Sequence, residues 1–260
     1  MGSNPDEVIF NFKECATLTK LRSLDLFSGI GGMTKALQEW VKPVLYCEID
    51  LFCQSVLLSR MDDGQLPKAI ICYDIAMLNA KPLKDKVDII YAGTPCQGFS
   101  VAGFKRGLGD ERSCLVQELI RICQECSPQF IFLENVPSIC NYGGIEIVKE
   151  IASMGYDCRW CVISASSIGA CHERQRWFML AHAKGLGRKE VRLSSGKKSS
   201  LSMSASKTKH DTSNRKEGNP PLFCGMDDVI PNRMDRIKAL GNSVVPLQVT
   251  QAFKILSGLS

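Results

Sequence analysis

The residue that first suggests chemistry is Cys96, which follows a short apolar run, residues 87–92, of the kind that predicts a buried strand. The run breaks at Gly93-Thr94-Pro95, and a glycine-rich stretch follows the cysteine. A thiol at the carboxyl end of a strand, ahead of a loop, is how an α/β enzyme would display a nucleophile. The alternative interpretation is a small apolar cysteine in a tight turn, because free cysteines are among the most often buried residues.

A glycine-rich turn near the N-terminus is the second candidate. Residues 21–27 predict a strand, residues 28–32 (Ser-Gly-Ile-Gly-Gly) a turn, and residues 33–40 a helix. Strand, glycine turn and helix open a nucleotide-binding α/β unit, in which glycines let the backbone approach a ligand closely. Glu48, about 20 positions further on, suits a pair of ribose hydroxyls. The alternative for this acid is a surface residue that caps the next helix.

The rest of the chain alternates strands and helices that would position these residues. Further strands are predicted at residues 44–47, 69–72, 130–133, 156–164 and 177–182. Helices are predicted at residues 51–61, 113–126 and 145–154, with residues 241–246 as a turn before a last helix. This order implies an α/β fold with a doubly wound, mostly parallel sheet, and 260 residues suit one large domain.

Composition narrows the class of protein. The chain has no apolar run of 18 residues, so no transmembrane helix is expected. Its 13 cysteines are odd in number and scattered, which favours a reducing compartment over a disulfide framework. Two Cys-x-x-Cys pairs, Cys123/Cys126 and Cys158/Cys161, lie too far apart for a usual zinc ribbon, so no metal is expected.

Positive charge is concentrated in one segment. Residues 184–219 hold ten Lys/Arg and three Asp/Glu, a local +7 against +5 overall, which leaves −2 for the remainder. The same segment has eight serines and no stable periodicity, so it reads as a loop or a poorly ordered insert. A basic block on a near-neutral body indicates a polyanion partner, although a solvated linker has the same composition.

Five motifs, taken in order, together resemble the cytosine-carbon-5 DNA methyltransferases, in particular bacterial and phage members. They are residues 25–32 (Asp-Leu-Phe-Ser-Gly-Ile-Gly-Gly), 93–100 (Gly-Thr-Pro-Cys-Gln-Gly-Phe-Ser), 134–136 (Glu-Asn-Val), Arg174-x-Arg176 and 241–244 (Gly-Asn-Ser-Val). The resemblance implies the S-adenosylmethionine-dependent methyltransferase fold. Its catalytic, cofactor-binding domain would comprise residues 21–183 and 225–260, after an N-terminal leader of residues 1–20, with residues 184–224 as a short basic target-recognition segment.

The resemblance also implies which residues bind the cofactor, S-adenosylmethionine. The methionine end would lie against Phe27, Gly29, Ile30 and Gly31. Glu48 would bind the ribose. The adenine would contact Ile49, Asp74 and Ile75. The remaining cofactor-binding residues would be Pro95 and Leu115, which line the pocket, and Asn242 and Ser243, which close it on the amino-acid moiety.

The family's chemistry would give each catalytic residue a role. Cys96 would add to carbon 6 of a cytosine flipped out of the duplex, so that carbon 5 can attack the methyl group. Glu134 would donate a hydrogen bond or a proton to the ring nitrogen. Arg176 would face the cytosine carbonyl and the thiol, and Arg174 would complete the catalytic set in a more structural role. A lid after the cysteine would contact DNA through Gln97, Ser100 and Arg106.

The expected partner is double-stranded DNA, with no membrane, a monomeric state and a cognate restriction endonuclease as a further partner. The expected location is the cytoplasm, in association with the nucleoid. Two alternatives remain: methylation of RNA cytosine, because the recognition segment is short, and a catalytically weak DNA-binding accessory protein that keeps the cofactor fold.

Overall fold

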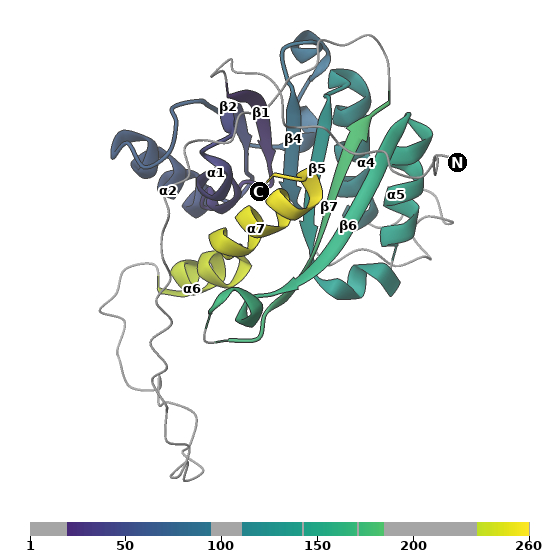
Figure 1. The fold of residues 1–260 in the computed structure, drawn as a ribbon. Helices are drawn as coiled ribbons and strands as arrows, with labels where there is room; N and C mark the ends of the chain where they lie inside the picture. Colours follow the sequence, from purple (N-terminus) through teal and green to yellow (C-terminus); the bar gives the residue numbers. More distant parts are fainter. Residues whose placement is uncertain (1–19, 95–110, 142, 171, 185–232, 260) are drawn as a thin grey trace, which may run out of the picture.

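The computed structural model describes residues 20–94, 111–141, 143–170, 172–184 and 233–259, which form one sheet flanked by helices (Figure 1). The strands are β1 (Leu21–Leu26), β2 (Val41–Cys47), β3 (Ile70–Cys72), β4 (Ile89–Gly93), β5 (Phe130–Asn135), β6 (Tyr156–Ser164) and β7 (Gln175–Ala183). The helices are α1 (Gly32–Leu37), α2 (Leu51–Asp62), α4 (Glu111–Cys126), α5 (Gly144–Ser153), α6 (Arg233–Asn242) and α7 (Pro246–Ser257). Short 3₁₀ turns are η1 (Ile75–Met77), η2 (Lys81–Leu83), η3 (Pro137–Asn141) and η4 (Ser166–Ile168).

The sheet has the strand order β3-β2-β1-β4-β5-β7-β6. Strands β1 to β5 pair in parallel, and β7 runs antiparallel to both β5 and β6. The order reverses between β1 and β4, the kind of switch point at which open α/β sheets bind ligands beyond the carboxyl ends of their strands. The predicted doubly wound, mostly parallel α/β fold is therefore confirmed.

Two apolar layers sandwich the sheet, and Figure 1 shows α1 and α7 on the opposite face from α4 and α5. Side chains alternate along β4, so that Ile89 and Tyr91 pack toward α1 and α7, whereas Ile90 and Ala92 pack toward α4 and α5. A strand buried on both faces reads as a continuous apolar run, which is why residues 87–92 stood out in the sequence.

Helix α6 is the one described helix that sequence reasoning missed, because residues 241–246 were assigned to a turn and nothing was assigned just before them. Two of its large apolar side chains, Met234 and Leu240, are mostly exposed, so the side chains that the structure describes in α6 form no wide apolar face. Ala239 packs with Ile30 and Cys53, which places α6 against the glycine turn and α2. Among the described residues, no helix is both long and apolar enough to cross a bilayer.

A buried polar network lies beneath the glycine turn. Thr34 in α1 donates its hydroxyl proton to the Asp25 carboxyl group in β1 at 2.6 Å, and the Thr34 and Tyr91 hydroxyls are also 2.6 Å apart. Asp25 and Tyr91 are almost completely buried. Burial raises the pKa of Asp25 to about 7, and the nearby negative charge of Glu48 adds to this shift, whereas the Thr34 hydrogen bond opposes it.

Replacement of Asp25 by asparagine should therefore change how stability depends on pH. A carboxyl group whose folded pKa is raised stabilises the protein below its unfolded pKa, and this contribution is lost as the pH rises through the folded value. Between pH 4 and pH 7, the unfolding free energy of the wild type should fall by up to about 1.4 kcal/mol per pH unit relative to Asp25→Asn. Urea unfolding across this range measures the difference, and parallel profiles for the two proteins would contradict the account.

Candidate active site

The acid of the predicted site is the residue before the last one of strand β5. Glu134 pairs through its backbone with Gly93 of β4 and Phe178 of β7, and its side chain is 10% exposed. Its carboxyl oxygen Oε1 lies 2.8 Å from Nε of Arg176. Burial raises the pKa of Glu134, although the positive charges of Arg176 and Arg174 oppose the shift. Glu134 lies within a strand and forms an ion pair, so it does not cap a helix.

The residues beside this carboxyl group hold the end of β4 in place. A Cβ atom at Gly93 would lie 3.3 Å from Glu134 Oε2, so the bare backbone makes room for the carboxyl group. Asn135 donates its side-chain amide to Thr94, at 2.7 Å to the hydroxyl and 3.1 Å to the carbonyl oxygen. Thr94 precedes Cys96 by two positions in the sequence. Five predicted site residues lie outside the described residues: Pro95, Cys96, Gln97, Ser100 and Arg106.

The glycine turn has a backbone that few other residues would adopt. Gly31 has a φ angle of 81°, and a Cβ atom there would lie 2.5 Å from a Leu66 methyl group. Phe27 and Gly29 also have positive φ angles, 56° and 53°. The Ser28 hydroxyl donates to the Asp25 carbonyl oxygen at 2.6 Å, which closes the turn over the end of β1.

The two acids after β2 have separate roles. The Glu48 carboxylate accepts hydrogen bonds from the backbone amides of Gly29, at 2.6 Å, and Asp50, at 2.8 Å. Asp50, rather than Glu48, caps α2 by accepting from the backbone amides at the start of that helix. The alternative interpretation of Glu48 as the helix cap is therefore wrong. Its carboxylate is held against the glycine turn and retains lone pairs for two hydroxyl groups.

Apolar and polar side chains continue this surface toward β3. Ile49 is 73% exposed, although it lies next to the anchored Glu48. Asp74 accepts a hydrogen bond from the Ala76 amide and so caps η1. Ile75 is buried in the same apolar cluster that Phe27 and Leu115 pack against. An anchored carboxylate, which accepts hydrogen bonds from hydroxyl groups, beside an exposed apolar side chain fits the sugar and base of a nucleoside.

A turn from the C-terminal part of the chain completes this side of the site. It follows Asn242, the last residue of α6, and a Cβ atom at Gly32 would lie 3.2 Å from Ser243 Oγ and 2.9 Å from a Val244 methyl group. The turn therefore packs directly against the glycine turn. Arg174 donates from Nη1 to the Gly241 carbonyl oxygen at 3.2 Å and from Nη2 to the Ser243 carbonyl oxygen at 2.7 Å.

The structure thus forms two adjoining groups from the predicted residues it describes. One group surrounds the carboxyl ends of β1, β2 and β3: Phe27, Gly29, Ile30, Gly31, Glu48, Ile49, Asp74, Ile75, Leu115, Asn242 and Ser243. The other comprises Glu134, Arg176 and Arg174, where β5 ends and β7 begins.

One contact in this region has no signal in the sequence. Arg60 of α2 donates from Nη1 to the Ile30 carbonyl oxygen of the glycine turn at 2.5 Å. An arginine in a predicted helix is usually an exposed residue, so its sequence position gave no reason to select it.

Comparisons with known proteins bear on the family and the fold of this chain. A family model described as C-5 cytosine-specific DNA methylase matches residues 21–232. The Type II methyltransferase M.CviJI of Paramecium bursaria Chlorella virus IL3A is 33% identical over 233 residues, which are 89% of this chain and 58% of the relative. M.HhaI of Haemophilus parahaemolyticus is 34% identical over 168 residues, which are 63% of this chain and 49% of the relative.

Solved structures give the same result for the fold. The crystal structure of the Dnmt2 methyltransferase of S. pombe superposes with a TM-score of 0.54 and 25% sequence identity, over 65% of this chain and 53% of that one. The chain spans 58% and 49% of the length of the two curated relatives described above.

The Glu134–Arg176 pair generates a prediction about stability. Replacing Arg176 by methionine leaves a buried carboxylate without its ion-pair partner, so the unfolding free energy at pH 7.5 should fall by about 3 kcal/mol. The folded pKa of Glu134 then rises further, and the stability that a raised carboxyl pKa removes grows as the pH rises from the unfolded pKa to the folded pKa. The loss should therefore be smaller at pH 5, as measured by urea unfolding.

The double variant Arg176→Met/Glu134→Gln is the control for this prediction. A neutral amide needs no cation, so the double variant should regain most of the stability at pH 7.5. An equal loss at both pH values in the single variant would show that the arginine acts through packing alone.

Proposed function

The chain belongs to the C-5 cytosine-specific DNA methylase family, and from this premise we propose that it transfers a methyl group to carbon 5 of cytosine in DNA. The observation that carries the proposal is the buried carboxyl group of Glu134, paired with Arg176 at the end of β5 and directly beside Gly93. This acid lies next to the strand end from which the chain continues to Cys96.

The raised pKa of Glu134 supports its role as the acid. Nucleophilic addition to a cytosine ring places negative charge on the ring, and a proton or hydrogen bond at the ring nitrogen offsets that charge. A buried carboxyl group holds its proton more readily than an exposed one. The Arg176 contact at Oε1 holds the group in one orientation, while Oε2 faces Gly93.

Cys96 is proposed as the nucleophile. Its sulfur forms a bond to carbon 6 of cytosine, and the ring electrons then make carbon 5 nucleophilic. After methylation, a base accepts the carbon-5 proton and the bond from carbon 6 to sulfur breaks, so that Cys96 leaves as a thiolate and the aromatic ring is restored. The position of the cysteine in the sequence, after a strand whose end Asn135 fixes through Thr94, supports this assignment.

S-adenosylmethionine would supply the electrophilic methyl group. The residues around the glycine turn fit it: Glu48 offers an anchored carboxylate for the ribose hydroxyls, and Ile49 an exposed apolar surface for the adenine. Asp74, Ile75 and Leu115 would border the same region, and Asn242 and Ser243 would face the amino-acid moiety, because Ser243 lies against Gly32 of the glycine turn.

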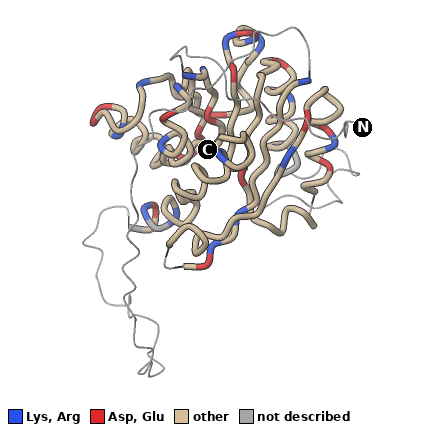
Figure 2. Tube along the Cα trace, viewed as in Figure 1, with Lys and Arg blue, Asp and Glu red and all other residues tan. Residues whose placement is uncertain are grey.

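Double-stranded DNA is the proposed substrate. A base inside the duplex is out of reach of any active site, so the cytosine must be flipped out, at a cost of a few kcal/mol. Figure 2 shows basic and acidic residues interspersed over the described part of the chain. We therefore assign phosphate binding to the basic segment of residues 184–219 and to Gln97, Ser100 and Arg106. A monomer, a cytoplasmic location and a cognate endonuclease, as for a Type II system, belong to the same proposal.

A covalent trap tests this function. Duplex DNA that contains 5-fluorocytosine cannot release the enzyme after methylation, because fluorine replaces the proton that must leave. With S-adenosylmethionine present, the full chain should form an adduct that survives denaturing electrophoresis, and Cys96→Ser should abolish it. Cys140→Ser, which changes an exposed free cysteine, is the matched control and should form the adduct.

The same experiment separates the alternatives. An adduct with RNA but none with DNA would identify an RNA methyltransferase. Binding of DNA without any adduct would identify an accessory protein.

A further inference from the structure

We propose that Arg174 is a positioning residue that fastens the turn after α6 to the start of β7, and so holds the cofactor side of the site closed. The proposal rests on the proposed function, because it concerns how this chain binds the methyl donor. It gives Arg174 a task different from that of Arg176, although the two arginines are two positions apart.

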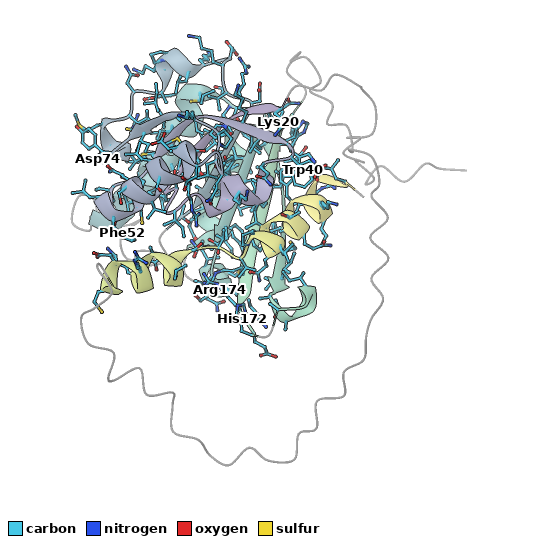
Figure 3. The ribbon with its side chains drawn as sticks, turned by 90° about the vertical axis from the view of Figure 1, so that its left-hand side faces the viewer. Lys20, Trp40, Phe52, Asp74, His172 and Arg174 are labelled. Atoms are coloured by element: carbon cyan, nitrogen blue, oxygen red, sulfur yellow. The ribbon has the colours of Figure 1, made fainter. Side chains whose placement is uncertain are left out.

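The contacts of the two arginines diverge. Arg176 directs its guanidinium to the carboxyl group of Glu134 on β5, at 2.8 Å. Arg174 directs its guanidinium to two backbone carbonyl oxygens, those of Gly241 and Ser243, at 3.2 and 2.7 Å. Figure 3 shows Arg174 beneath the connection between α6 and α7. Arg176 therefore pairs with the acid, whereas Arg174 binds the turn.

The turn offers what a guanidinium binds well. The last carbonyl groups of a helix have no partner within the helix, and the helix dipole makes this end negative. Gly241 lies in the last turn of α6, and Ser243 follows the helix. A planar guanidinium can donate to two such oxygens at once, whereas a lysine ammonium provides only a point charge. Burial and the nearby Arg176 lower the pKa of Arg174, but an arginine keeps its charge at neutral pH.

The backbone of Arg174 is fixed from the same direction. Gln248, a fully buried residue in the first turns of α7, donates its side-chain amide to the carbonyl oxygens of Arg174, at 2.6 Å, and Ile163, at 2.7 Å. These two hydrogen bonds attach the start of β7 and the end of β6 to α7. The backbone from which the Arg174 side chain extends is therefore held in place.

The turn of Ser243 and Val244 also packs against the glycine turn, which is where the cofactor would bind. Ser243 and Val244 lie so close to Gly32 that a Cβ atom at position 32 would come within 3.2 Å of both side chains. The turn is therefore held between Arg174 on one side and the glycine turn on the other. Loss of the guanidinium would free the turn from β7 and leave Asn242 and Ser243 without a fixed position.

Titration of the full chain with S-adenosylhomocysteine, the demethylated form of the cofactor, tests this role. Loss of two charged hydrogen bonds should raise the dissociation constant of Arg174→Met about tenfold or more. Arg174→Lys, which keeps the charge without the planar fork, should fall between this variant and the wild type. Amide hydrogen exchange of residues 243–250 should be faster in Arg174→Met even without ligand. The catalytic rate at saturating cofactor should stay within about threefold of the wild type.

Two further variants provide controls. Arg22→Met removes an arginine that donates to a carbonyl oxygen, that of Asp85 at 2.8 Å, at the opposite end of β1, and should leave the dissociation constant unchanged. Arg176→Met should behave in the reverse way to Arg174→Met, with cofactor binding retained and the catalytic rate lost.

The proposal would be overturned if Arg174→Met left the dissociation constant and the amide hydrogen exchange unchanged but lowered the catalytic rate at saturating cofactor. Arg174 would then act on the cytosine base. If the wild-type chain fails to bind S-adenosylhomocysteine, the proposed function fails instead. In that case hydrogen exchange of the ligand-free proteins still decides whether Arg174 holds the turn.

Discussion

Parallel strands end on a common edge of their sheet, and the candidate site depends on this constraint. The glycine turn follows β1, Glu48 follows β2, Asp74 follows β3, and Glu134 lies at the end of β5. These residues are far apart in the sequence, yet the parallel pairing of β1 to β5 brings them to the same edge. The strand order reverses between β1 and β4, so the residues after β1, β2 and β3 lie on one side of this switch point and Glu134 lies on the other.

Burial raises the pKa of two carboxyl groups near this edge of the sheet. Asp25 and Glu134 are both buried carboxyl groups with raised pKa values, but their surroundings differ. Asp25 is held by the Thr34 hydroxyl and has no cation beside it among the described residues, which suits a structural role beneath the glycine turn. Glu134 faces Arg176, so its proton affinity depends on its burial and on the opposing positive charges of Arg176 and Arg174. The two carboxyl groups therefore differ in their partners, and only Glu134 has the cationic neighbour that the proposed acid would have.

Sequence reasoning predicted those parts of the site that local pattern specifies. The spacing of the glycines and of Glu48 reflects one strand-turn-helix unit, so it could be read without a structure. Whether Glu48 or Asp50 capped α2 could not be read, because both acids lie at the start of the helix and only the direction of each side chain separates them. The contacts of Arg60 with Ile30 and of Arg174 with Ser243 join distant segments, so no local pattern encodes them.

The central claim is that this chain methylates cytosine in DNA. Bisulfite sequencing of plasmid DNA from a strain that expresses the chain, compared with the same plasmid from a strain without it, tests that claim most directly. The account predicts cytosines that resist conversion and that share one sequence context. Complete conversion of the plasmid DNA, from cells in which the folded chain is present, would contradict it.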